Sequence, residues 1–199
     1  GHKIISCTWV FCLKRYPDGT PKKHKARICL RGDLMETKDD EKTYSPVVSP
    51  ITIRLFLTIS KYISYTTCTF DFSNAFVQAD NPRETYMHIP RGFLGDKPNQ
   101  CLQLLKSIYG SIWAPRLFYN LARSVFEKIG LVKSDVDDCL FYGKNLFVII
   151  YVDDLGVAAL DPNDIDKLAS DIEAHGLKLT KEESFAEYLG IKYTDLSDG

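Results

Sequence analysis

Alternating blocks of apolar and polar residues predict a chain of strands and helices. Runs rich in β-branched and aromatic residues predict strands, and apolar positions that recur every four residues predict helices. The predicted strands cover residues 7–16, 25–30, 66–72, 86–89, 139–142, 146–150 and 155–160, with a last pair from residue 177 onward and around 188–193. The predicted helices cover residues 51–63, 114–128 and 162–175, and residues 73–76 form a turn or short helix. This order is that of the ferredoxin-like split βαβ arrangement.

Capping residues mark the ends of the predicted helices. Ser49–Pro50 and Asp161–Pro162 each supply an N-cap followed by a first-turn proline, whose missing N–H is not needed at a helix start. Gly130 and Gly176 lie where helices commonly end in a left-handed residue. Apolar side chains of the middle helix recur every four residues and predict a stripe that packs on a sheet, at Leu117, Leu121, Val125 and Ile129.

Two adjacent carboxylates, Asp153 and Asp154, interrupt the most apolar part of the chain, between the predicted strands 146–150 and 155–160. Neighbouring side chains on an extended backbone point to opposite faces, so these two share a target only if a tight turn bends the chain there. A hairpin does this. Carboxylates held close together repel unless a proton or a metal ion offsets the charge, which favours a Mg²⁺ site. The alternative is a merely hydrophilic turn.

A third acidic residue, Asp71, lies near the end of the predicted strand 66–72. In the split βαβ arrangement this strand can lie beside the hairpin that carries Asp153, although 82 residues separate them (153 − 71). This arrangement therefore allows Asp71 to lie near the two carboxylates of the hairpin.

The formal net charge of −1 conceals an uneven distribution. Residues 1–31 carry eight Lys/Arg and one acid, giving +7, whereas residues 133–199 carry six Lys/Arg and fifteen acids, giving −9. A basic end and a carboxylate-rich end suit a protein that attracts phosphate with one surface and holds metal with another. The alternative is charge on solvated faces, which we prefer for most acids at 161–187.

Composition and spacing exclude several classes of protein. A chain of 199 residues with 45% hydrophobic content can bury one good core or two small ones, and we expect one compact unit. No run approaches the ~20 apolar residues of a membrane span, and no signal-peptide pattern opens the chain, so we expect an intracellular protein without a membrane partner. The six cysteines lack CxxC pairs and indicate reduced core thiols. An RNP-type strand studded with aromatic residues is absent, which excludes that kind of RNA-binding domain.

Short sequence blocks in one order extend along nearly the whole chain. They are Trp9-Val-Phe11, Asp18-Gly-Thr20, Lys25-Ala-Arg27, Tyr44-Ser-Pro46, Thr52-Ile-Arg-Leu55, Phe70-Asp71, Asn74-Ala-Phe76, Ser107-Ile-Tyr-Gly110, Ala114-Pro-Arg116, Tyr151-Val-Asp-Asp154 and Tyr188-Leu-Gly-Ile191. Together they resemble the reverse transcriptase of copia-type LTR retrotransposons, an RNA-directed DNA polymerase. Chance agreement of so many blocks in one order is negligible.

The resemblance implies an α+β fold, the fingers and palm of a right-hand polymerase, with a ferredoxin-like antiparallel palm sheet and helices on one face. Residues 1–65 would be the fingers-like part, with a basic β-hairpin and an apolar helix. Residues 66–199 would be the palm-like part, with a fingers insertion at about 81–110. Thumb, connection, RNase H and integrase regions would fall outside the sequence. We therefore expect the isolated fragment to hold template-primer weakly and to be weakly active or inactive.

The resemblance also implies a two-metal site. Asp71, Asp153 and Asp154 would be the catalytic residues and, with the backbone of Phe72, the ligands of two Mg²⁺ ions, for which Mn²⁺ could substitute. Such a pair activates the primer 3′-hydroxyl and stabilises the pyrophosphate leaving group.

Further residues would bind the substrates. Lys25, Arg27, Phe76, Tyr109 and Gly110 match nucleotide-binding positions, with Phe76 as a steric gate against a ribose 2′-hydroxyl. The alternative for Phe76 is an ordinary core side chain. Contacts to the primer would come from Tyr151, Leu189 and Gly190.

The expected partners are an RNA or DNA template, a DNA or tRNA-like primer, deoxynucleoside triphosphates and the thumb and RNase H region of a longer polyprotein. The expected location is the cytoplasm, in a virus-like particle if the parent element is intact, or the nucleus. One departure from the family pattern is Trp113, where glutamine is usual before Ala-Pro-Arg. The competing interpretation is a degraded or co-opted module that binds nucleic acid without turnover.

Overall fold

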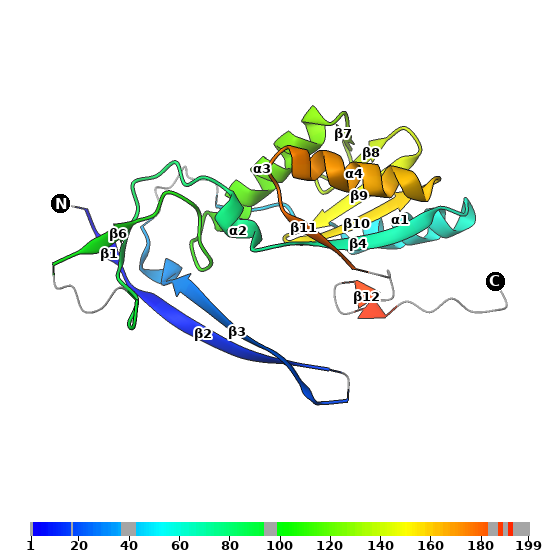
Figure 1. Cartoon of the computed structure of the whole chain (residues 1–199). Helices are drawn as coiled ribbons and strands as arrows, with labels where there is room; N and C mark the ends of the chain where they lie inside the picture. Colours follow the sequence, from blue (N-terminus) through cyan, green and yellow to red (C-terminus); the bar gives the residue numbers. More distant parts are fainter. Residues whose placement is uncertain are drawn as a thin grey trace. The chain divides into compact units, whose positions relative to one another are not determined.

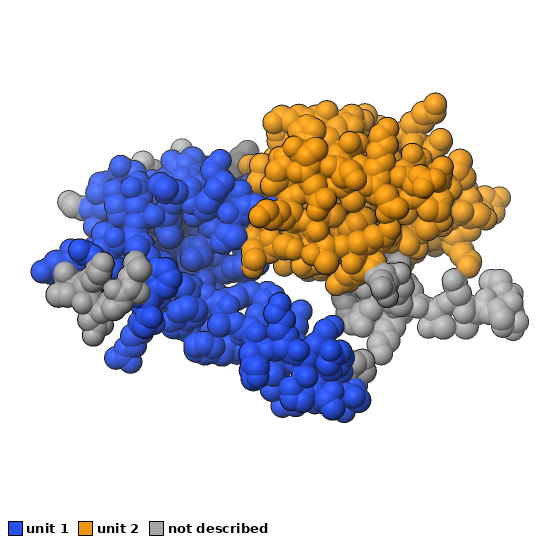
Figure 2. Space-filling model, in the orientation of Figure 1, with its two compact units in different colours: residues 1–44, 76–117 blue, residues 45–75, 118–199 orange. Residues whose placement is uncertain are grey.

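The computed structural model describes residues 2–16, 18–36, 43–93 and 99–182, together with the backbone of residues 187–188 and 191–192. The fold is mixed α+β and forms two compact units (Figures 1 and 2), so the expectation of one compact unit is wrong. The first unit comprises residues 1–44 and 76–117, and the second comprises residues 45–75 and 118–199. Each unit is thus assembled from two separate stretches of the chain.

The second unit is built on a six-stranded sheet in which every pairing is antiparallel. Its strand order is β11 (Leu179–Glu182), β4 (Thr66–Phe72), β10 (Asp154–Ala159), β9 (Leu146–Tyr151), β8 (Leu140–Gly143) and β7 (Val132–Lys133). Consecutive residues of the central strands are buried, including Val148, Ile149 and Ile150. Because successive side chains point to opposite faces, both faces are covered at the centre of this sheet.

Among the described residues of the second unit, the main helices are α1 (Pro50–Tyr62), α4 (Pro162–Ala174) and the later part of α3 (Ala114–Lys128). They begin and end within about two residues of the predicted positions. α1 packs against β9 and β10, and α4 packs against β10. The buried side chains of α4 follow the helical period, namely Ile165, Leu168 and Ile172. No helix among the described residues is both long and apolar enough to cross a membrane.

The first unit contains a long two-stranded ribbon and a small sheet. The ribbon pairs β2 (Cys7–Arg15) with β3 (Pro21–Leu30), and the small sheet has the order β1 (Ile4–Ile5), β5 (Tyr86–His88), β6 (Cys101–Gln103). Its core is Ile5, Leu30 and Met87. Two shorter elements are η1 (Gly32–Leu34) and α2 (Ala75–Gln78). The first residue of α2 belongs to the second unit, and the rest of α2 belongs to the first.

Several short elements were not predicted, because two or three residues give no measurable hydrophobic period. They are β1, β6, β7 and η1. Near the C-terminus, the backbone of β12 (Glu187–Tyr188) pairs with that of β13 (Ile191–Lys192). The prediction that the cysteines lie in the core is confirmed for Cys68 and Cys139, which are buried. Cys12 and Cys101 are exposed.

The N-terminus of α1 is held by a carboxylate from a distant loop. Ser49 is the N-cap, and its side chain accepts a hydrogen bond from the Thr52 N–H at 3.0 Å. Asp137 Oδ2 accepts hydrogen bonds from the Ser49 N–H at 3.0 Å and from the Thr52 hydroxyl at 2.5 Å. Asp137 Oδ1 accepts one from the Cys139 N–H at 2.9 Å. One carboxylate therefore ties α1 to the loop before β8.

Replacement of this carboxylate should weaken the second unit. We expect Asp137→Ala to lower the free energy of unfolding by about 2 kcal/mol, because it removes charge-assisted hydrogen bonds and leaves partly buried donors unpaired. Urea unfolding followed by circular dichroism measures the change. Asp135→Ala is the matched control, since Asp135 is exposed and its loss should change stability by less than about 0.5 kcal/mol. Equal stability of the two variants would contradict the assigned role.

Candidate functional site

Three acidic residues from distant parts of the sequence meet at one end of the six-stranded sheet. β4 and β10 are antiparallel neighbours, and Asp154 lies directly opposite Asp71. Side chains of directly opposite residues project from the same face of a sheet, with Cβ atoms roughly 5 Å apart. Asp153 lies in the turn before Asp154, and its carbonyl oxygen accepts a hydrogen bond from the Phe72 N–H at 2.8 Å. The three carboxylates therefore belong to one cluster.

The side chain of Phe72 points away from this cluster. It is 1% exposed, and its ring packs edge-on against that of Phe118 with the ring centroids 5.2 Å apart. Because successive residues of a strand point to opposite faces, burial of Phe72 directs Asp71 to the other face. The backbone is thus the part of Phe72 that lies beside the carboxylates.

A strained turn carries Asp153. β9 and β10 pair Tyr151 with Asp154, which leaves Val152 and Asp153 as a two-residue turn. Val152 has a φ of 55°, in the left-handed region that β-branched residues rarely adopt. Two-residue hairpin turns with positive φ at the first central residue favour glycine there. Such a backbone conformation costs on the order of 1–3 kcal/mol and persists only where its surroundings enforce it.

The carboxylates repel one another. Burial, and then the negative charges of Asp153, Asp71 and Glu182, raise the pKa of Asp154 to about 6. Glu182 ends β11, which lies on the other side of β4 and places Thr180 opposite Asp71. Glu182 carries no signal in the sequence that links it to this cluster, because only the strand order brings it here. At neutral pH the cluster carries excess negative charge that a cation would offset.

The donors suit a hard divalent cation. Mg²⁺ binds carboxylate and carbonyl oxygens and keeps several of its waters, so two or three protein carboxylates suffice. Within the described ranges, no three His, Cys, Asp or Glu side chains already surround a common metal position. Asp71, Asp153 and Asp154 nevertheless supply donors of the kind that such an ion binds, and the strand register sets Asp71 opposite Asp154.

The first unit brings together several of the residues predicted to bind a nucleotide. The Arg27 guanidinium lies over the Tyr109 ring, with Cζ 5.0 Å from the ring centroid. The Phe76 ring is edge-on to the same tyrosine, with centroids 4.8 Å apart. Arg27 Nε is buried and has no hydrogen-bond partner among the described residues. Lys25 lies two residues earlier on β3 and therefore projects from the same face as Arg27.

Gly110 is required by a close backbone approach. Its φ is 83°, and a Cβ atom there would lie 2.1 Å from the carbonyl oxygen of Leu30. The Leu30 N–H donates a hydrogen bond to the Tyr109 carbonyl oxygen at 2.7 Å. Any larger residue at position 110 would push this loop off the end of β3, and Tyr109 would lose its place beside Arg27.

The remaining predicted residues are placed as follows. Tyr151 ends β9 directly opposite Asp154. Leu189 and Gly190 lie outside the described residues. Trp113 is 7% exposed, and the Arg83 guanidinium covers its ring with Cζ 4.4 Å from the centroid. Trp113 is thus a packed side chain of the first unit.

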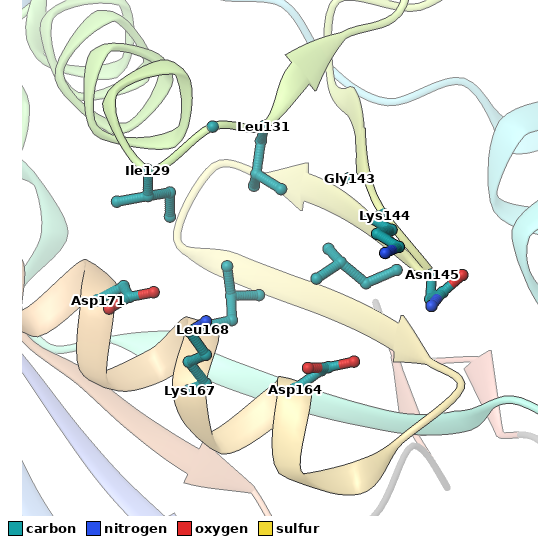
Figure 3. Close-up of a pocket in the computed structure, with 11 residues that line it drawn as sticks. Ile129, Leu131, Gly143, Lys144, Asn145, Asp164, Lys167, Leu168 and Asp171 are labelled. Carbon is teal, nitrogen blue, oxygen red and sulfur yellow. The ribbon is translucent and has the colours of Figure 1, made fainter.

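A cavity of about 430 Å³ lies at the other end of the sheet, between α4 and the turn that joins β8 to β9 (Figure 3). Figure 3 shows Asp164 and Lys167 of α4 on one side and Lys144 and Asn145 of the turn on the other. Its lining contains none of the residues predicted from the sequence to bind metal, nucleotide or primer. The carboxylate cluster, at the hairpin end of the same strands, is therefore the candidate site.

Comparison with known proteins identifies the family of the chain. A family described as "Reverse transcriptase (RNA-dependent DNA polymerase)" matches residues 1–199. The chain is 34% identical to the retrovirus-related Pol polyprotein from transposon RE1 of Arabidopsis thaliana, over 95% of this chain and 13% of that protein. It is 31% identical to the corresponding polyprotein from transposon TNT 1-94 of Nicotiana tabacum, over 86% of this chain and 14% of that protein.

These matches extend over nearly the whole sequence. A second Arabidopsis thaliana polyprotein, from transposon RE2, is 31% identical over 98% of this chain and 14% of its own length. The chain thus spans about one seventh of the length of each of these three polyproteins. It belongs to the reverse transcriptase family and, within that family, to the reverse transcriptases of copia-type retrotransposons.

Proposed function

We propose that this chain is a polymerase domain of the fingers and palm type, and that it extends a primer on an RNA or DNA template. The single observation that supports this most directly is the register of β4 and β10, which sets Asp71 opposite Asp154 beside the turn that holds Asp153. In this proposal the second unit is the palm, with a ferredoxin-like sheet, and the first unit is the fingers. The proposed substrates are deoxynucleoside triphosphates, and the primer is DNA or tRNA-like.

Asp71, Asp153 and Asp154 would hold two Mg²⁺ ions, or Mn²⁺, with the Phe72 carbonyl as a further ligand. When bound, such a pair of ions lowers the pKa of the primer 3′-hydroxyl and stabilises the charge of the departing pyrophosphate. The protein residues position these groups. The hydrogen bond from Phe72 to Asp153 and the enforced turn at Val152 fix the backbone of the hairpin, so the carboxylates approach their target in a set orientation.

The first unit would bind the incoming nucleotide. Lys25 and Arg27 would neutralise the triphosphate, and the buried Arg27 Nε–H is a donor that a phosphate oxygen satisfies. The Phe76 ring meets the Tyr109 ring edge-on and supplies the bulk that exclusion of a 2′-hydroxyl would require. Phe76 is half-buried, which leaves part of its ring accessible to a substrate.

Primer extension tests the proposal. Asp153→Asn and Asp71→Asn should each reduce extension at least about a hundredfold, because each removes negative charge from the proposed metal site. Extension is measured with the 199-residue chain and with the same chain joined to the downstream region of a related Pol polyprotein. Asp135→Asn, an exposed acid outside the cluster, should extend like the parent. Nucleic-acid binding without extension in both forms would instead support a binding module without turnover.

The raised pKa of Asp154 predicts a pH-dependent stability in metal-free buffer. Because the folded-state pKa of about 6 exceeds the ordinary value of 3.8, the folded state binds this proton more tightly than the unfolded state. The stability that the proton provides is present below about pH 4 and is lost as pH rises to about 6. Asp154→Asn should therefore be more stable than the parent at pH 7, by about 1 kcal/mol after solvent screening, and similar to it at pH 4.

Thermal melting at each pH, in EDTA and then in Mg²⁺, measures this effect. Mg²⁺ should raise the melting temperature of the parent more than that of Asp154→Asn, because the ion binds the folded carboxylates. Asp135→Asn serves as the control and should keep the parent's pH profile. If the melting temperature of Asp154→Asn changed with pH in the same way as that of the parent, Asp154 would not be strongly coupled to its neighbours.

Phe76 should discriminate between sugars. Phe76→Ala should raise ribonucleotide incorporation relative to deoxyribonucleotide incorporation by at least about tenfold, because exclusion by size depends on the ring. A core role predicts a stability loss of ~3–5 kcal/mol instead. Phe93→Ala is the control, since Phe93 is a 44% exposed phenylalanine of the same unit. A folded Phe76→Ala variant with unchanged sugar preference would exclude the gate.

A further inference from the structure

The helix α1 is apolar on two sides. Its inner side packs in the second unit through the buried residues Ile53, Phe56 and Ser60. A helix at the surface of a protein normally presents polar side chains to solvent, and a helix that is apolar all round is normally covered all round. The exposed side chains of α4 follow this rule, since they include Asp166 and Glu173. The outer side of α1 does not follow it.

Four large apolar side chains form an exposed stripe along the outer side of α1. Intervals of four, four and three residues place them on one side of the helix. Their exposed fractions are 68% for Ile51, 53% for Leu55, 43% for Ile59 and 88% for Tyr62. Single exposed apolar residues are ordinary, but a continuous row of them marks an interaction surface.

Two cations flank this stripe with the spacing of paired helices. Arg54 and Lys61 are exposed, are seven residues apart, and directly precede Leu55 and Tyr62. Seven residues make about two helical turns, so both cations lie on one flank of the stripe, roughly 10 Å apart along the helix. In paired helices, the residue directly before an apolar contact position is the one whose charge selects the partner.

Charge identifies the kind of partner. The sequence of α1 contains no aspartate or glutamate. Its outer side therefore combines apolar side chains with positive charge of one sign. A helix that has an apolar stripe of its own, flanked by aspartate or glutamate, is complementary to both features.

A second copy of this chain fits less well. An antiparallel pair of α1 helices would set Arg54 of each copy near Lys61 of the other, and like charges repel. A parallel pair would set Arg54 beside Ile59 of the other copy, which offers no opposite charge. The acidic helix α4 is also a poor partner, because its exposed side chains include Asp166, Ser170 and Glu173 in place of an apolar stripe.

An anionic lipid surface is the other chemistry that an apolar and basic helix meets. Segments that bind such surfaces by charge carry clusters of about 4–8 Lys or Arg, each contributing roughly 1 kcal/mol. The helix α1 carries Arg54 and Lys61 alone. The number of cations therefore favours a protein helix over a membrane.

We propose that the outer side of α1, centred on Leu55, docks an acidic amphipathic helix of a partner protein. The apolar stripe supplies the contact area, and Arg54 and Lys61 select a partner of negative charge. The inference goes beyond the proposed polymerase function and does not depend on it, because no residue of the stripe belongs to the carboxylate cluster.

Two synthetic peptides, each about three heptads long, test this proposal. Both carry leucine at the apolar contact positions, and the flanking positions are glutamate in one peptide and lysine in the other. Fluorescence anisotropy measures binding of each labelled peptide to the 199-residue chain. We expect the glutamate peptide to bind at least about fivefold more tightly than the lysine peptide, and this preference to shrink as salt is added.

Substitution of the stripe tests the apolar contact. Leu55→Ser should weaken binding of the glutamate peptide about tenfold, because the contact with a leucine side chain is lost. Val132→Ser is the matched control. Val132 is a 51% exposed apolar residue of β7, a strand that β8 separates from β9, so its loss should leave peptide binding unchanged. Thermal melting checks that each variant is folded, and substitution of such exposed side chains should preserve the fold.

Reversal of the two cations tests the selection by charge. The double variant Arg54→Glu, Lys61→Glu should prefer the lysine peptide, because the sign of the flank is exchanged. An apolar surface without selectivity would bind both peptides equally in the parent and in this variant. That result would overturn the proposal.

Three other outcomes would also overturn it. The first is that neither peptide binds, or that Leu55→Ser binds the glutamate peptide as tightly as the parent. The second is that the parent forms a dimer in sedimentation and Leu55→Ser abolishes it, which would assign the stripe to a second copy. The third is that phosphatidylserine vesicles bind the parent but not Leu55→Ser, while the glutamate peptide does not compete. Primer extension enters none of these assays, so loss of the polymerase proposal would leave this inference standing.

Discussion

The antiparallel pairing of β4 with β10 is the constraint on which the site depends. It sets Asp154 opposite Asp71 and directs Phe70 and Phe72 to the other, buried face. A shift of register by one residue would exchange these faces and place a carboxylate in the core. Burial of that charge would cost far more free energy than the loss of any single contact. The hydrophobic residues of β4 and β10 therefore specify the position of the acids, even though the acids themselves repel one another.

The sequence predicted the elements with strong local signals. Ser49 and Asp161 marked the starts of α1 and α4, because an N-cap side chain satisfies a free N–H wherever a helix begins. The adjacent Asp153 and Asp154 predicted a hairpin, since only a turn gives neighbouring carboxylates a common target. Family resemblance supplied Asp71 as their companion, together with the residues that meet in the first unit around Tyr109.

Other features of the site have no local signal. The strain at Val152 was not predictable, because valine is a strand-forming residue and only the two-residue turn forces a positive φ on it. Glu182 raises the pKa of Asp154 from across β4, and Asp137 accepts a hydrogen bond at the start of α1. Both interactions arise only from tertiary structure.

The interleaving of the two units has a consequence for synthesis of the chain. β4 ends at Phe72, whereas its partners β10 and β11 begin at Asp154 and Leu179. A ribosome that adds ~5–20 residues per second needs several seconds to bridge that interval. Throughout it, β4 exposes two unpaired edges and a row of phenylalanine and cysteine side chains. The strand that carries the first carboxylate is therefore exposed to aggregation until its partners have been synthesised.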